Sequence, residues 1–267
     1  MSLWLAFFGL FVAQAAPTVE TLQAAWQAVA GAVSAGARFP LTPRPSDLAT
    51  VAAGGVARRR LADPQGDRAM GVGWSPYGQA ALWVGIIDDQ HFTLVKGLRE
   101  QQLPGTTLTR KLLFQHLDLP WPLSDRQWVI ELRNNEPLWR STGGAAWERY
   151  WTLADAALAI DPNPEGVWLP ACEGAWLLVD THPGTLVVYQ ARTEIGGIVS
   201  PDVATTWALT TVESLMKAAL GRASAIPGHY GATHAPIAAP DGRALQEGDV
   251  KASAGSVKGA AGGESGW

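Results

Sequence analysis

The chain of 267 residues is long enough for one large domain or two small ones, and its 47% apolar residues allow a sizeable core. A net charge of −4, with only 16% charged residues and no basic stripe, excludes a protein built to bind nucleic acid. The single cysteine, Cys172, excludes an intramolecular disulfide and a zinc site made of several thiolates. The 13 tryptophans suit either a filled core or a cavity wall, and composition does not choose between them.

The N-terminus carries an apolar run over residues 3–12, followed by Ala13-Gln14-Ala15-Ala16. This pattern predicts a secretory signal peptide over residues 1–16, cleaved near Ala15 or Ala16. The run is too short to span a hydrocarbon core of about 30 Å. Because no Lys or Arg precedes it, a buried or membrane-anchoring helix is the alternative. We therefore expect a secreted or periplasmic protein.

The C-terminus is of low complexity. Residues 241–267 are rich in Gly, Ala and Ser and offer no apolar face, so residues 223–267 are expected to form a disordered tail. His229 and His234 could ligate a metal, but two histidines without a carboxylate in such a segment do not define a site. We therefore expect no metal, and a single domain over residues 18–222.

Helical and strand patterns alternate at the start of this domain. Over residues 18–33, apolar positions recur at spacings of three and four, which predicts an amphipathic helix. Strands are expected at 55–61 and 70–74. Ser75-Pro76 is a helix-start signal, so a helix is expected to reach Asp88, although a strand over 81–87 is the alternative.

The second half of the domain is dominated by strands, with hairpin turns at Leu103-Pro104-Gly105 and His182-Pro183-Gly184. A long helix then starts at Ser200-Pro201 and is apolar on most sides, which indicates burial on most sides. The order predicts an α+β fold in which a curved antiparallel sheet wraps around the C-terminal helix. The strands are expected at 93–102, 106–117, 126–133, 146–153, 174–181 and 185–194, and the helix ends near Leu220.

Three segments resemble those of a known family. Residues 118–129 read Asp-Leu-Pro-Trp-Pro-Leu-Ser-Asp-Arg-Gln-Trp-Val, residues 173–178 read Glu-Gly-Ala-Trp-Leu-Leu, and residues 184–189 are followed by Gly196-Gly197 and Pro201. This set resembles bacterial START-domain proteins of the helix-grip (SRPBCC) superfamily.

The START resemblance, which covers about residues 55–220, implies a helix-grip fold with an internal cavity. It implies non-catalytic binding, and optionally transfer, of a lipid or other hydrophobic small molecule, with the C-terminal helix as the gate. No cofactor is implied, and we expect a monomer that makes at most transient contact with a membrane surface. Two alternatives remain: a cyclase-like or hydrolytic enzyme on the same fold, and a ligand-independent structural or sensor module.

Side-chain alternation along strands selects the residues that should face the cavity. If Arg149 points inward, it is a buried charge that needs a partner or a polar ligand group. For every position, simple core packing is the alternative. The expected ligand-binding residues are Leu112, Phe114, Trp128, Ile130, Leu132, Trp147, Arg149, Trp151, Trp176, Leu178, Val187, Tyr189, Thr193, Trp207, Thr211 and Leu215.

Catalytic motifs are missing from the sequence. There is no G-x-S-x-G turn, no H-E-x-x-H helix and no phosphate-binding glycine loop. Among the histidines, only His116 shares the Leu112/Phe114 face and is expected to point inward, whereas His91 is interpreted as a solvated loop residue. We therefore predict no catalytic residue.

Overall fold

The computed structural model describes residues 16–88, 91, 95, 97–119, 123–196 and 201–254, with the backbone alone for 201–207 and 254. The apolar run of the predicted signal peptide lies outside these residues, as does the Pro-Trp-Pro part of the family motif. No helix within the described residues combines the length and the apolar character needed to cross a membrane.

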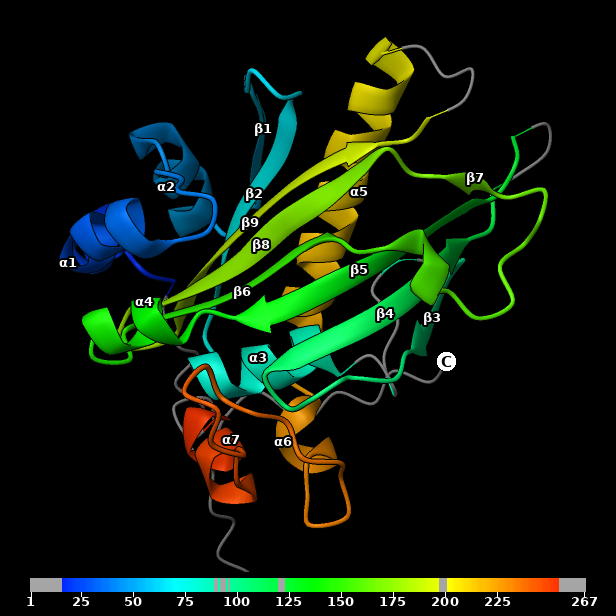
Figure 1. Ribbon diagram of the computed structural model, residues 1–267. Coiled ribbons are helices and arrows are strands. Elements are labelled where there is room, and N and C mark those ends of the chain that lie inside the picture. The colour runs from blue at the N-terminus through cyan, green and yellow to red at the C-terminus, as the bar shows by residue number, and fades with distance from the viewer. Residues whose placement is uncertain are drawn as a thin grey trace, which may run out of the picture.

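A single curled sheet organises the described chain (Figure 1). Eight strands pair antiparallel in the order β1-β2-β9-β8-β6-β5-β4-β3, and the short β7 pairs with β5 in parallel. The two outermost strands do not pair with each other, so the sheet stays open. The strands are β1 (Ala57–Leu61), β2 (Arg68–Ser75), β3 (Leu98–Gln102), β4 (Arg110–Leu117), β5 (Arg126–Asn134), β6 (Ala146–Leu153), β7 (Val167–Trp168), β8 (Ala171–Asp180) and β9 (Thr185–Glu194).

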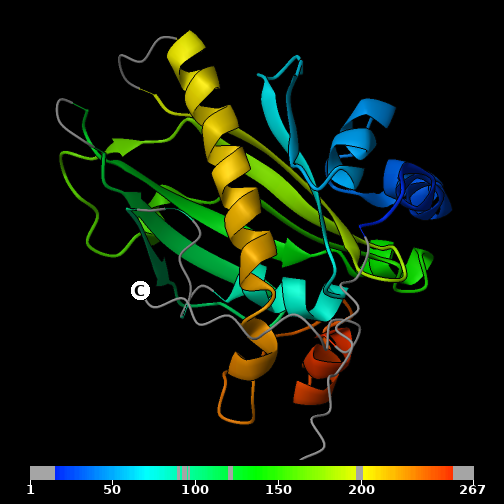
Figure 2. The same ribbon diagram turned by 180° about the vertical axis from the view of Figure 1, so that it is seen from behind.

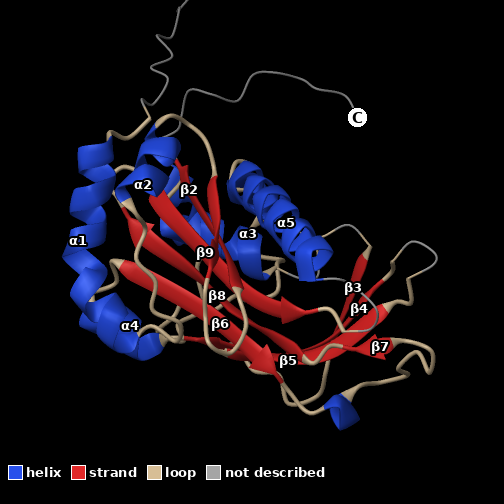
Figure 3. Cartoon of the chain, turned by 90° about the horizontal axis from the view of Figure 1, so that it is seen from above, coloured by secondary structure: helices blue, strands red, loops and turns tan. Residues whose placement is uncertain are grey.

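Helices cover both faces of this sheet. The long α5 crosses the concave face with α3 near its C-terminal end, while α1 and α2 cover the outer face (Figures 2 and 3). Thr18 caps α1 by accepting a hydrogen bond from the Thr21 amide at 3.2 Å. The helices are α1 (Val19–Gly36), α2 (Pro45–Ala52), α3 (Gln79–Ile87), α4 (Glu136–Ser141), the 3-10 turn η1 (Ala156–Leu158), α5 (Pro201–Arg222), α6 (Ile226–His229) and α7 (Glu247–Ala254).

Strand alternation divides the buried side chains between two cores. On β8, Leu177 packs with α1 on the outer face, whereas Leu178 joins the core beneath α3 and α5. On β9, Val188 likewise belongs to the outer core and Val187 to the core beneath α3 and α5. Neighbouring residues of one strand point to opposite faces, so each strand contributes to both cores.

Two glycines of β2 let α5 approach the sheet closely. A Cβ on Gly71 would lie 2.8 Å from both Met216 Cγ and Val212 Cγ1, and one on Gly73 would lie 2.7 Å from Leu220 Cδ1. Such distances are shorter than packed carbon atoms allow. The C-terminal half of α5 is therefore seated directly on β2.

The predicted α+β helix-grip fold is confirmed. Strands β6 and β9 have the predicted bounds, and the segment before Asp88 is the helix α3 rather than a strand. Helices α2 and α4 were not expected, because their sequences are short and contain prolines.

The expectation of a disordered tail from residue 223 is wrong for residues 223–254. This segment contains α6 and α7, and it packs against α3 through Ile226, Tyr230 and Val250, all of which are buried. A few spaced apolar side chains anchor it to a neighbouring helix, although it has no continuous apolar face.

Candidate functional site

A cavity of about 480 Å³ lies between the concave face of the sheet and α5. Pockets that hold small molecules measure about 300–1,000 Å³. Strands β4, β5, β6, β8 and β9 form its walls, and residues Ile86 and Ile87 at the end of α3 border it. Ala208, Thr211 and Leu215 of α5 cover it. Thr211 and Leu215 alternate along α5 with Val212 and Met216, which contact β2, so one side of the helix rests on β2 and the adjacent side covers the cavity.

Aromatic side chains from four strands form much of the wall. Trp151 and Trp176 flank Tyr189, with ring centroids 5.8 and 4.6 Å from that of the tyrosine. Trp128 also lines the cavity, and its indole N–H donates to Gln115 Oε1 at 2.6 Å. The tryptophans at this place border the space rather than fill it.

One fully buried cation belongs to the same wall. Arg149 of β6 is 2% exposed and lines the cavity, and its Nη1 donates to Asn134 Oδ1 at 2.7 Å. Burying a guanidinium among apolar side chains is costly unless polar groups surround it. The cavity thus places a buried guanidinium beside its aromatic and aliphatic wall residues.

Two residues of the cavity wall, Cys172 and Tyr189, are held in their protonated forms. Burial raises the pKa of the Cys172 thiol to about 12, although hydrogen bonding to Trp151 and Thr193 acts in the opposite direction. Burial likewise raises the pKa of Tyr189 above its ordinary value. At neutral pH these groups are a thiol and a phenol, which are poor nucleophiles.

Charged residues gather where the cavity approaches the surface. Arg60 and Asp67 form an ion pair across the β1–β2 hairpin, and Glu194 ends β9 beside them. Their side chains are partly or largely exposed. This end of the cavity is therefore in contact with solvent and provides an entrance.

Ten of the predicted ligand-binding residues line the cavity together. They come from five elements that are widely separated in the sequence, so alternation selected the correct face on most strands. Whether they contact a ligand stays a prediction. They are Trp128, Ile130, Leu132, Arg149, Trp151, Trp176, Tyr189, Thr193, Thr211 and Leu215.

The inward orientation expected for Leu112, Phe114 and His116 is wrong. Leu112 and Phe114 pack with Val129 in a small cluster on the outer face. Both faces of β4 mix apolar with polar residues, so polarity alone could not choose the inward face. Gln115, on the face of β4 opposite to Leu112 and Phe114, lies in the cavity wall, where its Oε1 accepts from Trp128 Nε1.

Three other predicted residues occupy the concave side without bordering the cavity. Leu178 and Val187 are fully buried in the packed core near α3. Trp147 packs edge-on against Trp83 of α3, with centroids 5.5 Å apart. The reason is that α3 fills this end of the concave face. The side chain of Trp207 lies outside the described residues.

Sequence reasoning missed wall residues that a strand register would have found. Leu113 lies directly opposite Ile130, and Gln115 lies opposite Trp128, in the β4–β5 pair. Directly paired residues share a face of the sheet. The β4 wall residues are therefore Leu113, Gln115 and Leu117, together with Lys111 at its start.

No protein-family model matches the sequence, and no curated protein matches it. Solved structures do match. The fragment of a STAR-related lipid transfer protein from Xanthomonas axonopodis is 19% identical, with a TM-score of 0.53 over 63% of this chain and 92% of that one. Human STARD10 is 11% identical, with a TM-score of 0.56 over 73% of this chain and 86% of that one.

Human StAR-related lipid transfer protein 5 also matches, with 12% identity and a TM-score of 0.54 over 77% of this chain and 97% of that one. The class of fold is therefore helix-grip α+β, with a sheet curled around a C-terminal helix. Within that class, the chain has a START-like fold.

Proposed function

We propose that this protein binds one lipid or other hydrophobic small molecule, non-covalently, in the cavity between the sheet and α5. The observation that carries the proposal is the cavity itself, about 480 Å³ with three tryptophans in its wall. Burial of an acyl chain there contributes roughly 0.8 kcal/mol per methylene before association costs are subtracted. The lipid transfer named for two of the similar structures agrees with this class of ligand.

The bound molecule is amphipathic in this proposal, with its polar group at Arg149. Arg149 is 2% exposed and lines the cavity together with Trp128, Trp151 and Trp176. A ligand group that accepts hydrogen bonds lowers the cost of burying this charge. The hydrocarbon part then lies along Trp128, Trp151 and Trp176.

The gate in this proposal is the part of α5 that covers the cavity. Met216 and Leu220 are seated on the glycines of β2, whereas Thr211 and Leu215 face the void. Residues over a void make fewer stabilising contacts than residues in a packed core. In this proposal, movement of α5 away from the cavity opens a path for the ligand.

Export completes the proposal. The N-terminal pattern of an apolar run followed by Ala-x-Ala supports a cleaved signal peptide and a secreted or periplasmic location. A soluble carrier in such a compartment can shield a molecule that water rejects. Transfer between membranes is the use that this location favours.

The test is native mass spectrometry of the protein expressed with its own N-terminus, followed by organic extraction of any adduct. We expect one apolar molecule per chain and a mature mass that starts near residue 16 or 17. A ligand-free mass that persists after incubation with mixed phospholipid and fatty-acid vesicles would contradict the binding function. An unprocessed N-terminus would contradict export alone.

Trp128→Ala tests whether the ligand occupies this cavity. The substitution removes one wall, so the amount of ligand retained is expected to fall several-fold. The matched control is Trp26→Ala, which removes a buried tryptophan of α1 from the outer core. It should destabilise the fold by about 3–5 kcal/mol and leave the bound molecule unchanged. If both variants retained the same amount of ligand, the ligand would not be bound in this cavity.

A further inference from the structure

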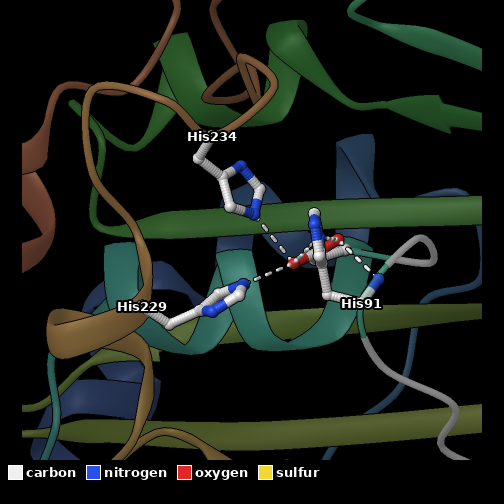
Figure 4. A group of neighbouring side chains, drawn as sticks. His91, His229 and His234 are labelled. Carbon is white, nitrogen blue, oxygen red and sulfur yellow. Dashed lines mark hydrogen bonds and ion pairs between the residues drawn. The ribbon is translucent and has the colours of Figure 1, made fainter.

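Three of the five histidines of this chain meet at one carboxylate, in a region that the cavity does not include. They are His91 after α3, His229 at the end of α6 and His234 in the following loop. The carboxylate belongs to Asp88, the residue that ends α3. Figure 4 shows the three imidazoles arranged around this carboxylate from different sides.

The chain after α5 is held firmly enough to position two of these histidines. Trp83 Nε1 of α3 donates to the Ala238 carbonyl at 2.8 Å, and Tyr230 Oη donates to the Leu245 carbonyl at 3.0 Å. Ile226 is fully buried against α3. The geometry of His229 and His234 relative to Asp88 is therefore set by a packed core and not by a surface loop alone.

The contacts within this group, named here the Asp88 cluster (Asp88, His91, His229 and His234), are short. Asp88 Oδ1 lies 2.8 Å from His91 Nδ1, and Asp88 Oδ2 lies 2.9 Å from His234 Nε2 and 3.5 Å from His229 Nε2. One ligand atom from each of the four residues lies within 4.8 Å of the other three. Ligand atoms around a tetrahedral zinc ion are about 3.3 Å apart, so small side-chain rotations bring the set to that spacing.

His234 supplies a second observation that points to a cation. Its side chain is 5% exposed, and each ring nitrogen faces an oxygen acceptor: Nε2 faces Asp88, and Nδ1 lies 2.7 Å from the Ala235 carbonyl. A neutral imidazole has only one N–H to donate. The two contacts therefore require either an imidazolium, which donates from both nitrogens, or a metal ion at Nε2, where Nδ1–H donates to the carbonyl and orients the ring, as is usual for metal-bound histidines.

A second group of acidic and histidine side chains provides an internal comparison. His116, Asp118 and Asp125 also lie close together, but Arg99 is among them. Its Nη2 lies 2.8 Å from His116 Nδ1 and donates to Asp118 Oδ1 at 2.7 Å. In that group a guanidinium already supplies the positive charge.

Two cations lie close to the Asp88 cluster: Arg222 of α5 interacts electrostatically with Asp88, and Lys111 Nζ of β4 donates to the Ile87 carbonyl at 3.0 Å. The Arg222 Nη1 donates to the Gly85 carbonyl at 3.4 Å, on the α3 backbone. The carboxylate oxygens of Asp88 lie 2.8–3.5 Å from the three imidazoles.

We propose that Asp88, His91, His229 and His234 bind one Zn²⁺ ion, which clamps the segment after α5 onto the end of α3. Three imidazoles and a carboxylate are ligands that zinc prefers, and four protein ligands complete a tetrahedral structural site. The ion joins two separate stretches of chain, residues 88–91 and 229–234. Because Ile86 and Ile87 line the cavity directly before Asp88, the clamp also fixes one end of the cavity wall.

The test uses the full chain, freed of metal with a chelator and titrated with Zn²⁺ alone by calorimetry. We expect one Zn²⁺ per chain, a rise in the melting temperature on binding, and no such response to Mg²⁺. Tetrahedral Co²⁺ absorption in the visible range checks the geometry. The absence of stoichiometric Zn²⁺ binding by the folded wild-type chain would overturn the proposal.

Single substitutions identify which side chains bind the Zn²⁺ ion. His234→Ala removes a buried ligand and is expected to weaken Zn²⁺ binding more than 100-fold, since loss of an outer-shell partner alone costs about 10–100-fold. His91→Ala removes a largely exposed ligand, so it tests the site even if the buried variant folds poorly. The matched control is His182→Ala, an exposed histidine in a hairpin turn, which should bind Zn²⁺ as the wild type does. Undiminished binding in His91→Ala and His234→Ala would also overturn the proposal.

Discussion

Two buried charges stand side by side on β6 and point to opposite faces of the sheet. Glu148 faces outward, where both carboxylate oxygens accept from the Arg38 amide at 3.1 Å and one accepts from Asn135 Nδ2. Arg149 faces inward, onto the cavity. The outer charge is surrounded by donors that the chain itself supplies, while the inner charge borders a space.

The same difference runs through the whole sheet. On the outer face, α1 places Leu22, Trp26 and Val29 into a packed core. On the concave face, packing is complete only at the α3 end and where α5 touches β2, and the remainder is hollow. The outer face therefore serves stability, and we infer that the hollow part of the inner face serves binding.

The largest effect is expected where the inner face is packed most tightly. Gly71→Val places a branched side chain where Met216 and Val212 already touch the glycine. Overpacking of this kind costs about 1–3 kcal/mol, and it should displace α5 and so reduce ligand retention. Chemical denaturation and native mass spectrometry measure the two effects.

The control for Gly71→Val is Gly31→Ala in α1, where a Cβ would meet nothing within 4 Å. This change should stabilise the helix by about 0.5–1 kcal/mol and leave the ligand unaffected. If Gly71→Val kept full stability and full ligand retention, the close contact with Gly71 would not be what holds α5 in position over the sheet.

Sequence patterns located the sheet and the long helix because both depend on local periodicity. They chose the inner face correctly on β5, where Trp128, Ile130 and Leu132 alternate with more polar neighbours. They failed on β4, where Leu112, Leu113 and Phe114 are all apolar. Only the pairing register with β5 decides between those faces, and register is a non-local property.

The Asp88 cluster illustrates the same limit. Asp88 and His91 lie more than 130 positions from His229 and His234, so no spacing in the sequence connects them. Their approach depends on the packing of Ile226 and Tyr230 against α3. Composition suggested disorder for this segment because its anchors are few, and their effect appears only when the partner helix is present.

An effect on ligand affinity rather than on the whole fold is expected from Arg149→Met, which tests the inner charge. Loss of a charged hydrogen bond to a bound headgroup costs about 1.5–3 kcal/mol, so affinity for hexadecanoic acid should fall about 10- to 100-fold. Affinity for its methyl ester should change much less. Displacement of a fluorescent fatty acid measures both. Arg149→Lys keeps the charge and is expected to retain most of the preference for the acid. Equal losses for acid and ester would show that Arg149 does not contact the polar group.

The smallest expected effect is a dependence of the free energy of unfolding on pH, which arises from the outer charge, Glu148. Burial raises the pKa of Glu148 above 4.5, despite opposing hydrogen bonds from Asn135 and from the amides of Arg38 and Phe39. Above pH 4.5 the folded state therefore holds this proton more tightly than the unfolded state does. The contribution of Glu148 to the free energy of unfolding must then decrease as pH rises from 4.5 through the higher native pKa.

Glu148→Gln removes this titration, so the difference in unfolding free energy, wild type minus variant, should fall with rising pH over that window. Chemical denaturation at several pH values measures it. Glu136→Gln, at an exposed carboxylate of α4 paired with Arg140, is the control and should show no comparable fall. A difference that stays level or rises for Glu148→Gln would mean that the outer donors stabilise the ionised carboxylate more than burial destabilises it.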